Sequence, residues 1–277
     1  MKRILYLLIV VLFTLSSCRD KDLDMTLMSK TIYEGAVINE ITASDAWHVT
    51  VIQDENTFVE LEYSAFLEEY LRVTNSDSEL KIGFSRSLNI PSNTVMNATV
   101  HTRSLQKVHL SEAVSAVLDG HFPEASLTME LEDAATCKGG DFSGRADVKL
   151  SSASTLVDCY FHGLLCNIEL DDASVFKGWF TEDSLFVKLN GASRLTTYGG
   201  VVGGANVEVS EASSLNMLQT YISRMMFIVV QDASEASVAV TRPAILEGFV
   251  MNASTLHYQG NPILDVACDA TSTLSPL

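Results

Sequence analysis

Carboxylates recur at one place in a repeated phrase of this 277-residue chain. The phrase reads apolar, polar, acidic or small, Ala, Ser, any, apolar, and a clear copy is 170–176 (LDDASVF). Its successive alanines are 17 to 21 residues apart between Ala113 and Ala270. Six of the residues that precede an alanine are acidic: Glu112, Asp133, Asp172, Glu211, Asp232 and Asp269. If the copies stack in register, these side chains form one column, the acidic ladder.

The acidic ladder has two interpretations. Hard cations take several oxygen ligands, so stacked carboxylates could form a strip for Ca²⁺ or for a cationic ligand. Short polar side chains also suit a solvated corner, where they cap the turn backbone. The chain lacks the dense Gly-Asp nonapeptide of calcium β-rolls. The sequence therefore favours the corner and predicts no cofactor, with Ca²⁺ as the candidate ion if one binds.

A column of serines runs beside the carboxylates, at Ser154, Ser174, Ser193, Ser213, Ser234 and Ser254. A nucleophilic serine needs a neighbouring base and an oxyanion site. The six histidines share no repeat position with these serines. We predict no catalytic residue here and expect the hydroxyls to form hydrogen bonds along the stack.

Four cysteines follow Cys18 in the sequence: Cys137, Cys159, Cys166 and Cys268. No C-x-x-C pair and no histidine at metal-ligand spacing accompanies them, so the sequence predicts no zinc site. Cys137 falls at an inward repeat position, which favours buried thiols over a disulfide. The pairing of the four cysteines stays open at this level.

The strands that must position these residues are visible as a two-residue alternation before each alanine. Apolar residues lie three and five positions before it, with a charged residue such as Glu169 or Lys188 between them. Such alternation is typical of half-buried strands. The copies show no helical stripe and are rich in Ser, Thr, Val and Gly. With about 20 residues per coil, the sequence predicts an all-β fold, a parallel β-helix whose equivalent strands pair about 4.8 Å apart.

Enzymes that act on polysaccharides exist on β-helices, but this is an analogy of fold alone. Four acidic residues are scattered candidates for such chemistry: Asp141, Asp147, Asp158 and Glu182. Trp47 and Trp179 could stack on sugar rings, although a core or cap position is the commoner place for tryptophan. The formal charge of −17 implies repulsion of nucleic acid, so we expect no nucleic-acid partner.

The N-terminus has the features of an export signal. Residues 1–17 combine Lys2 and Arg3 with an apolar run too short to span a bilayer, which predicts a signal peptide. The segment 15–18 (LSSC) resembles the lipobox of bacterial lipoproteins, and that resemblance implies lipid attachment at Cys18. We interpret 18–30 as a lipid-anchored tether that holds the protein at a membrane.

The remaining chain divides by the clarity of its repeat. Residues 31–97 show alternating strands without a clear Ala-Ser phrase, which predicts an N-terminal β-rich cap together with the first coils. Residues 98–277 carry the regular β-helix coils, and 263–277 are expected to form a last, incomplete coil.

Several of these features together resemble the head-GIN putative auto-transporter adhesin domain family. The resemblance is carried by the lipobox, the strand Val49-Thr50-Val51, the strand Leu80-Lys81-Ile82 and the serial Ala-Ser turns. It implies a right-handed parallel β-helix and an outer-surface lipoprotein. The family's usual turn has Gly before Ala-Ser, whereas here only Gly191 matches.

We therefore expect a non-catalytic, lipid-anchored envelope protein whose solenoid is an adhesive or binding surface, with a glycan or an extracellular protein as partner. The expected location is the outer membrane, at the cell surface or alternatively facing the periplasm. Two other functions stay open at this level. One is a glycan-binding or glycan-active protein of a polysaccharide utilisation system, and the other is a structural, periplasm-facing envelope component.

Overall fold

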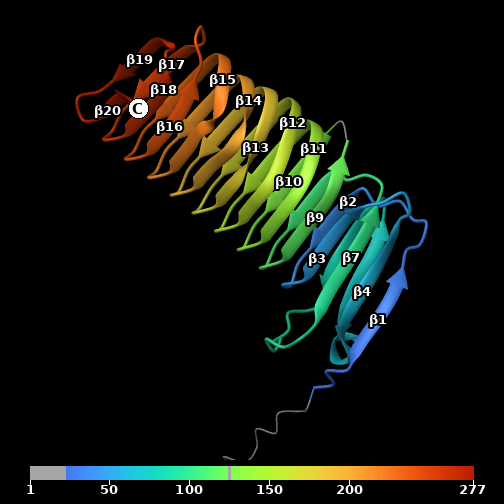
Figure 1. Cartoon of the computed structure of the whole chain (residues 1–277). Coiled ribbons are helices and arrows are strands. Elements are labelled where there is room, and N and C mark those ends of the chain that lie inside the picture. Colours follow the sequence, from blue (N-terminus) through green and yellow to red (C-terminus); the bar gives the residue numbers. More distant parts are fainter. Residues whose placement is uncertain (1–22, 124–125) are drawn as a thin grey trace, which may run out of the picture.

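The computed structural model describes residues 23–123 and 126–277, and in them it confirms the predicted β-helix. The predicted signal peptide, 1–17, and the predicted lipid-attachment residue Cys18 lie outside the described residues. Figure 1 shows an elongated stack of coils, a solenoid of about 8 turns with about 20 residues per coil. Only one short 3-10 segment, η1 (Ala65–Leu67), interrupts the strands in the described part of the chain. No helix in these residues is long and apolar enough to cross a membrane.

The regular coils are built from strands that each pair in parallel with the equivalent strand of the next coil. The first coils contain β8 (Lys107–Leu110), β9 (Ser115–Phe122), β10 (Ser126–Leu131), β11 (Thr136–Leu150) and β12 (Thr155–Leu170). The middle coils contain β13 (Val175–Leu189), β14 (Arg194–Val209) and β15 (Ser214–Val230). The last coils contain β16 (Glu235–Val240), β17 (Ile245–Val250), β18 (Thr255–Gly260), β19 (Ile263–Cys268) and β20 (Thr273–Pro276).

The core lies inside the coils, because alternate side chains of each strand point inward. Leu170, Leu189 and Val209 are paired in register in three successive coils, and all three are buried. A second inward column contains phenylalanines: the ring centroids of Phe122 and Phe142 are 5.7 Å apart, and those of Phe142 and Phe161 are 5.3 Å apart. Such columns bury apolar surface against the coils above and below, which a single coil cannot do alone.

The N-terminal part wraps around one early coil. That coil contains β2 (Glu40–Ala43) and β3 (His48–Gln53), which pair in parallel with β8 and β9. The paired residues are 67 positions apart in the chain, as Glu40 and Lys107 are. The intervening chain forms β4 (Phe58–Ser64), β5 (Leu71–Ser76), β6 (Glu79–Phe84) and β7 (Met96–Thr102). β6 and β7 cover the open edges of β2 and β3, and β1 (Leu27–Ile32) adds to β4 in antiparallel fashion. This arrangement blocks the sheet edge at that end.

Candidate functional site

The Ala-Ser phrase forms a tight turn in each regular coil. In the copy around Ala212, the N–H of Ser213 donates to the carbonyl of Ser210, and both central residues have positive φ, 56° for Glu211 and 60° for Ala212. Positive φ at both positions defines a type I′ turn, which favours Gly, Asn and Asp. The Ala212 N–H then donates to the carbonyl of Asp232 in the next coil, at 3.0 Å. The turns are therefore stacked by backbone hydrogen bonds.

Five of the six residues of the acidic ladder lie in this column: Glu112, Asp133, Asp172, Glu211 and Asp232. They occupy the first positive-φ position of successive turns and their side chains are exposed. Asp45 extends the column towards the N-terminus, because the Ala46 N–H donates to the carbonyl of Glu112. Ser152, Gly191 and Asn252 interrupt it, as their places in the sequence require.

Asp269 does not belong to the column, which corrects the prediction that it is part of the acidic ladder. The last coil is shorter, so its turn shifts by one residue and Thr271 stacks on Ala253. Asp269 lies one position earlier and accepts hydrogen bonds from the N–H of Asn252 at 2.8 Å and from the hydroxyl of Thr271 at 2.8 Å. These bonds hold the pKa of Asp269 well below its usual range, and the bond from the Asn252 N–H has the largest effect. Its carboxylate caps the final turn.

The serine column lies inside the coils and is buried. The hydroxyl of Ser213 accepts from the N–H of Ser193, and that of Ser234 accepts from the N–H of Ser213, both at 3.2 Å. The hydroxyl of Ser154 is buried without a partner. The hydroxyls of Ser174 and Ser193 also lack a partner, so the expected hydrogen bonds along the stack form in only part of this column.

The four cysteines of the described chain are unpaired. Cys137, Cys159 and Cys166 are buried, and Cys268 is exposed. Burial raises the pKa of Cys137 to about 12 and raises that of Cys159 well above its usual value. The three buried thiols therefore act as small apolar core groups.

The two tryptophans have opposite environments. Trp47 is 0% exposed, in the core of the early coil, whereas Trp179 is 37% exposed on the outer side of β13. Three exposed tyrosines of β12, β14 and β15 accompany Trp179: Tyr160, Tyr198 and Tyr221. The ring centroids of Trp179 and Tyr198 are 4.8 Å apart. We call these four residues the aromatic face.

The aromatic face rests on a well-packed support. Phe161 and Phe180, whose ring centroids are 5.9 Å apart, point inward from the same strands as Tyr160 and Trp179. On the outside, Gly199 pairs in register with Trp179, and a Cβ there would lie 3.4 Å from Cδ1 of the indole. The glycine thus leaves room for the indole beside the next coil. Rigid aromatic side chains of this kind bind ligands at low entropic cost.

A second outward surface, the charged groove, spans β10 to β14 and has a volume of about 500 Å³. Its floor is a column of alternating sign: Glu130, Lys149, Glu169, Lys188 and Glu208. The Glu169 carboxylate lies 3.3 Å from Nζ of Lys149 and 3.8 Å from Nζ of Lys188. Opposite charges in register stabilise neighbouring strands. The exposed ring of Phe186 lies in the same groove.

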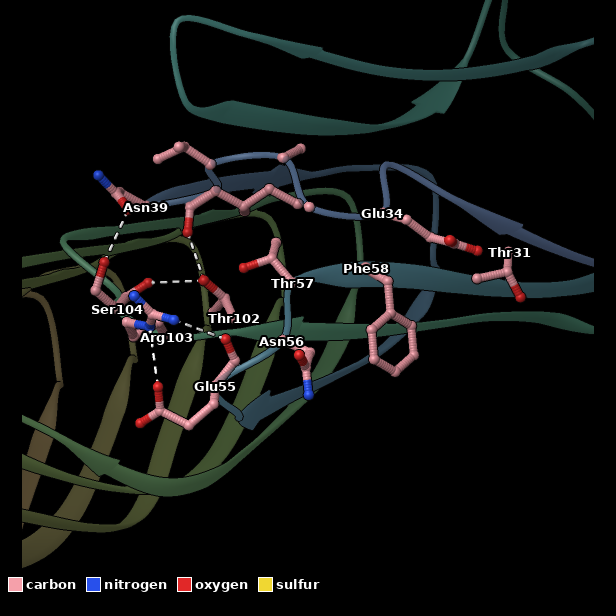
Figure 2. Close-up of a pocket in the computed structure, with 14 residues that line it drawn as sticks. Thr31, Glu34, Asn39, Glu55, Asn56, Thr57, Phe58, Thr102, Arg103 and Ser104 are labelled. Atoms are coloured by element: carbon pink, nitrogen blue, oxygen red, sulfur yellow. Dashed lines mark hydrogen bonds and ion pairs between the residues drawn. The ribbon is translucent and has the colours of Figure 1, made fainter.

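A hollow of about 690 Å³ lies beside the N-terminal strands (Figure 2). Arg103 forms an ion pair with Glu55 at 3.2 Å and donates to its backbone carbonyl at 3.0 Å. The hydroxyl of Ser104 donates to Oδ1 of Asn39 at 2.8 Å, and that of Thr102 donates to the carbonyl of Ile38. These contacts connect the loops of the cap, so we interpret the residues around the hollow as structural.

The four scattered acidic candidates do not converge. The Arg145 guanidinium, 3.0 Å from Asp147, lowers the pKa of that carboxyl, and Asp158 lies 3.4 Å from Nζ of Lys138. Glu182 points into the core between coils, is 5% exposed, and has its pKa raised to about 7 by burial. The carboxyl with a raised pKa is therefore buried, whereas a general acid for glycoside hydrolysis must reach the substrate.

Asp141 has a different environment, which the sequence did not indicate. It lies between His121 and His162, and one ligand atom from each of the three side chains lies within 4.8 Å of the other two. Among residues 23–123 and 126–277, this is the one group of three or more such side chains close enough to hold a metal ion. The acidic ladder does not form such a group there.

The family follows from a comparison with known proteins. A family model, "Putative auto-transporter adhesin, head GIN domain", matches residues 38–262. The chain belongs to this family. No curated protein sequence matches it.

Solved structures show the same fold. A "putative adhesin" of Parabacteroides merdae has a TM-score of 0.68 at 13% identity, with 91% of this chain and 96% of that chain covered. A "putative adhesin" of Parabacteroides distasonis has a TM-score of 0.61 at 16% identity, with 92% and 98% covered. A "putative lipid binding protein" of the same organism has a TM-score of 0.62 at 13% identity, with 92% and 98% covered. At these identities the likeness concerns the fold alone.

Proposed function

We propose that this protein is a non-catalytic, lipid-anchored envelope protein that binds uncharged glycan chains through its aromatic face. The observation that carries the proposal is the set of exposed rings on neighbouring coils, Tyr160, Trp179, Tyr198 and Tyr221. Sugar rings present C–H groups on their faces, and these pack on aromatic rings whose edges remain in water. A chain of several sugars could contact several coils at once.

The electrostatics of the protein select the class of glycan. A formal charge of −17 repels polyanions such as uronate or sulfate polymers. The lysines of the described coils that could offset this charge are largely paired, as Lys138 is with Asp158 and Lys149 with Glu169. Uncharged chains do not meet this repulsion.

The environments of the acidic residues support a role without catalysis. A glycan-cleaving acid needs a raised pKa and access to the substrate. Asp147 is accessible but its pKa is lowered by Arg145, and Glu182 has a raised pKa but lies in the core. The two properties do not occur together in either residue.

Binding is tested with the purified full chain on an array of uncharged and acidic polysaccharides, followed by calorimetry. Trp179→Ala should weaken binding at least about tenfold, since an aromatic residue of this kind dominates an interface. Phe186→Ala in the charged groove and Phe249→Ala on β17 are matched controls that remove an exposed ring elsewhere. Unchanged affinity in Trp179→Ala, or a loss in Phe186→Ala, would remove the aromatic face from the proposal. Release of new reducing ends from a bound glycan would favour the enzyme alternative.

The anchor and the location are tested in cells. Labelling with an alkyne fatty acid should mark the protein and fail in Cys18→Ala, as the sequence 15–18 (LSSC) predicts. Protease added to intact cells should degrade the protein while a periplasmic control survives. Survival until lysis would place the solenoid inside the envelope and favour the periplasm-facing alternative.

A further inference from the structure

Three side chains from neighbouring coils converge on the outer surface next to the aromatic face. His121 is on β9, Asp141 on β11 and His162 on β12, and β11 pairs with both other strands. Nδ1 of His121 lies 3.1 Å from Oδ2 of Asp141, and Nε2 of His162 lies 3.0 Å from Oδ1. The imidazole rings are parallel within 3°, with centroids 5.5 Å apart. One carboxylate is thus shared by two imidazoles.

We propose that His121, Asp141 and His162 form a site for a divalent transition-metal ion, and we take Zn²⁺ as the ion with which to test it. Two imidazole nitrogens and one carboxylate oxygen are a donor set that borderline metals such as Zn²⁺, Cu²⁺ and Ni²⁺ accept. Hard ions such as Ca²⁺ prefer an all-oxygen set, which this group does not offer.

The observed spacing fits such an ion. With metal–ligand bonds of about 2.0–2.1 Å, ligand atoms of a tetrahedral site lie roughly 3.3 Å apart. Each imidazole nitrogen lies at about this distance from one oxygen of Asp141, His121 from Oδ2 and His162 from Oδ1. The remaining nitrogen–nitrogen separation is within 4.8 Å and can close by rotation of the side chains, since His121 is exposed. Strand pairing fixes the three backbones, so the coils supply the site without refolding.

The site leaves room for a further ligand. Three protein ligands leave a fourth coordination position open, as in zinc sites that bind water or substrate. Tyr160 pairs in register with Asp141, and its ring centroid is 5.0 Å from that of His162. A metal ion here would thus lie beside the aromatic face, on the same outer surface.

Calorimetric titration of the full chain with ZnCl₂ at pH 7.5 tests the proposal. We expect one ion per chain, with affinity reduced at least about tenfold in each of His121→Ala, His162→Ala and Asp141→Asn. His48→Ala, which removes another exposed histidine, should leave binding unchanged. The three substituted residues are on the outer surface of the coils, so circular dichroism should show the same fold in every variant.

A second readout identifies the ligands themselves. Electron paramagnetic resonance of the Cu²⁺ form should show two coupled imidazole nitrogens in the native chain and one in each histidine variant. Absence of saturable Zn²⁺ binding, or retention of the affinity in both histidine variants, would overturn the proposal. So would loss of binding in His109→Ala instead, because His109 lies 3.3 Å from Glu130 and 3.1 Å from Glu132.

Discussion

The acidic ladder and the outer column that runs through the aromatic face are both formed by side chains on stacked coils, but they differ in how far the residue type repeats. In the turn column, each coil supplies a small or acidic residue followed by Ala, with the same two positive φ angles. This outer column, which includes Tyr160 and Trp179 of the aromatic face, changes at every coil: His121, Asp141, Tyr160, Trp179 and Gly199 follow one another in register. We infer that repetition marks the residues that hold the solenoid together, and that ligand chemistry lies where a column changes.

The largest expected effect separates the inner from the outer side of the same strands. Phe161→Ala removes a buried ring from the phenylalanine column and should lower the free energy of unfolding by about 3–5 kcal/mol. Trp179→Ala removes a ring on the outer side of β13 and should change it by less than about 1 kcal/mol. Urea unfolding followed by circular dichroism measures both. Similar losses in the two variants would mean that the aromatic face is structural.

A carboxyl buried between the coils gives the next largest effect. Burial raises the pKa of Glu182 to about 7 from 4.5, so between these values the unfolded chain ionises it while the folded chain keeps the proton. Stability from this group is therefore present at low pH and lost as pH rises through about 7. Glu182→Gln should match the native chain at pH 4.5 and exceed it by about 3 kcal/mol at pH 8. A difference that is constant with pH would show that the carboxyl is not desolvated.

The buried serines offer a matched pair within one repeated column. Ser213→Ala removes the acceptor of the Ser193 N–H and should cost about 1 kcal/mol. Ser154→Ala removes a buried hydroxyl that has no partner, and should be neutral or slightly stabilising. Thermal unfolding of the two variants gives the comparison. Equal destabilisation of the two variants would contradict a stabilising role for the hydrogen bonds of the serine column.

The smallest expected effect concerns the acidic ladder itself. Glu211 stacks next to Asp232, whereas Asp172 lies between Ser152 and Gly191. Glu211→Gln should therefore stabilise the chain by a few tenths of a kcal/mol, about 0.2–0.5, through relief of like-charge repulsion at low salt, and Asp172→Asn should not. Salt at about 0.5 M should remove the difference by screening. The test compares the melting temperatures of both variants and the native chain at about 10 mM and about 500 mM NaCl, between which screening changes strongly.

The repeat made most of the fold predictable. A period near 20 residues predicted stacked coils, and the alternation before each alanine predicted which side chains face the core. The turn at Asp45 and Ala46 shows the limit, since its coil stacks on that of Ala113 across the whole inserted cap. The long separation between the two copies concealed this contact in the sequence.

The candidate site was harder to predict, for a geometric reason. Bulges shift the register of successive strands, for example between Gly139 and Asp141 and between Gly178 and Trp179. His121 consequently lies eight positions after its turn alanine and Trp179 only six, yet both belong to one outer column. Columns counted from the alanine do not reveal them as neighbours. The signal available was the one-coil spacing of 121, 141 and 162.

The sequence by itself determined the solenoid, its turns and the inward side of its strands, because these depend on periodicity and on local backbone preferences. Only the tertiary structure decided which outward side chains become neighbours. Those neighbours are a full coil apart in the chain, and the bulges that set their register leave no periodic mark. The pairing of Asp141 with two histidines and the exposure of Trp179 both depend on that register.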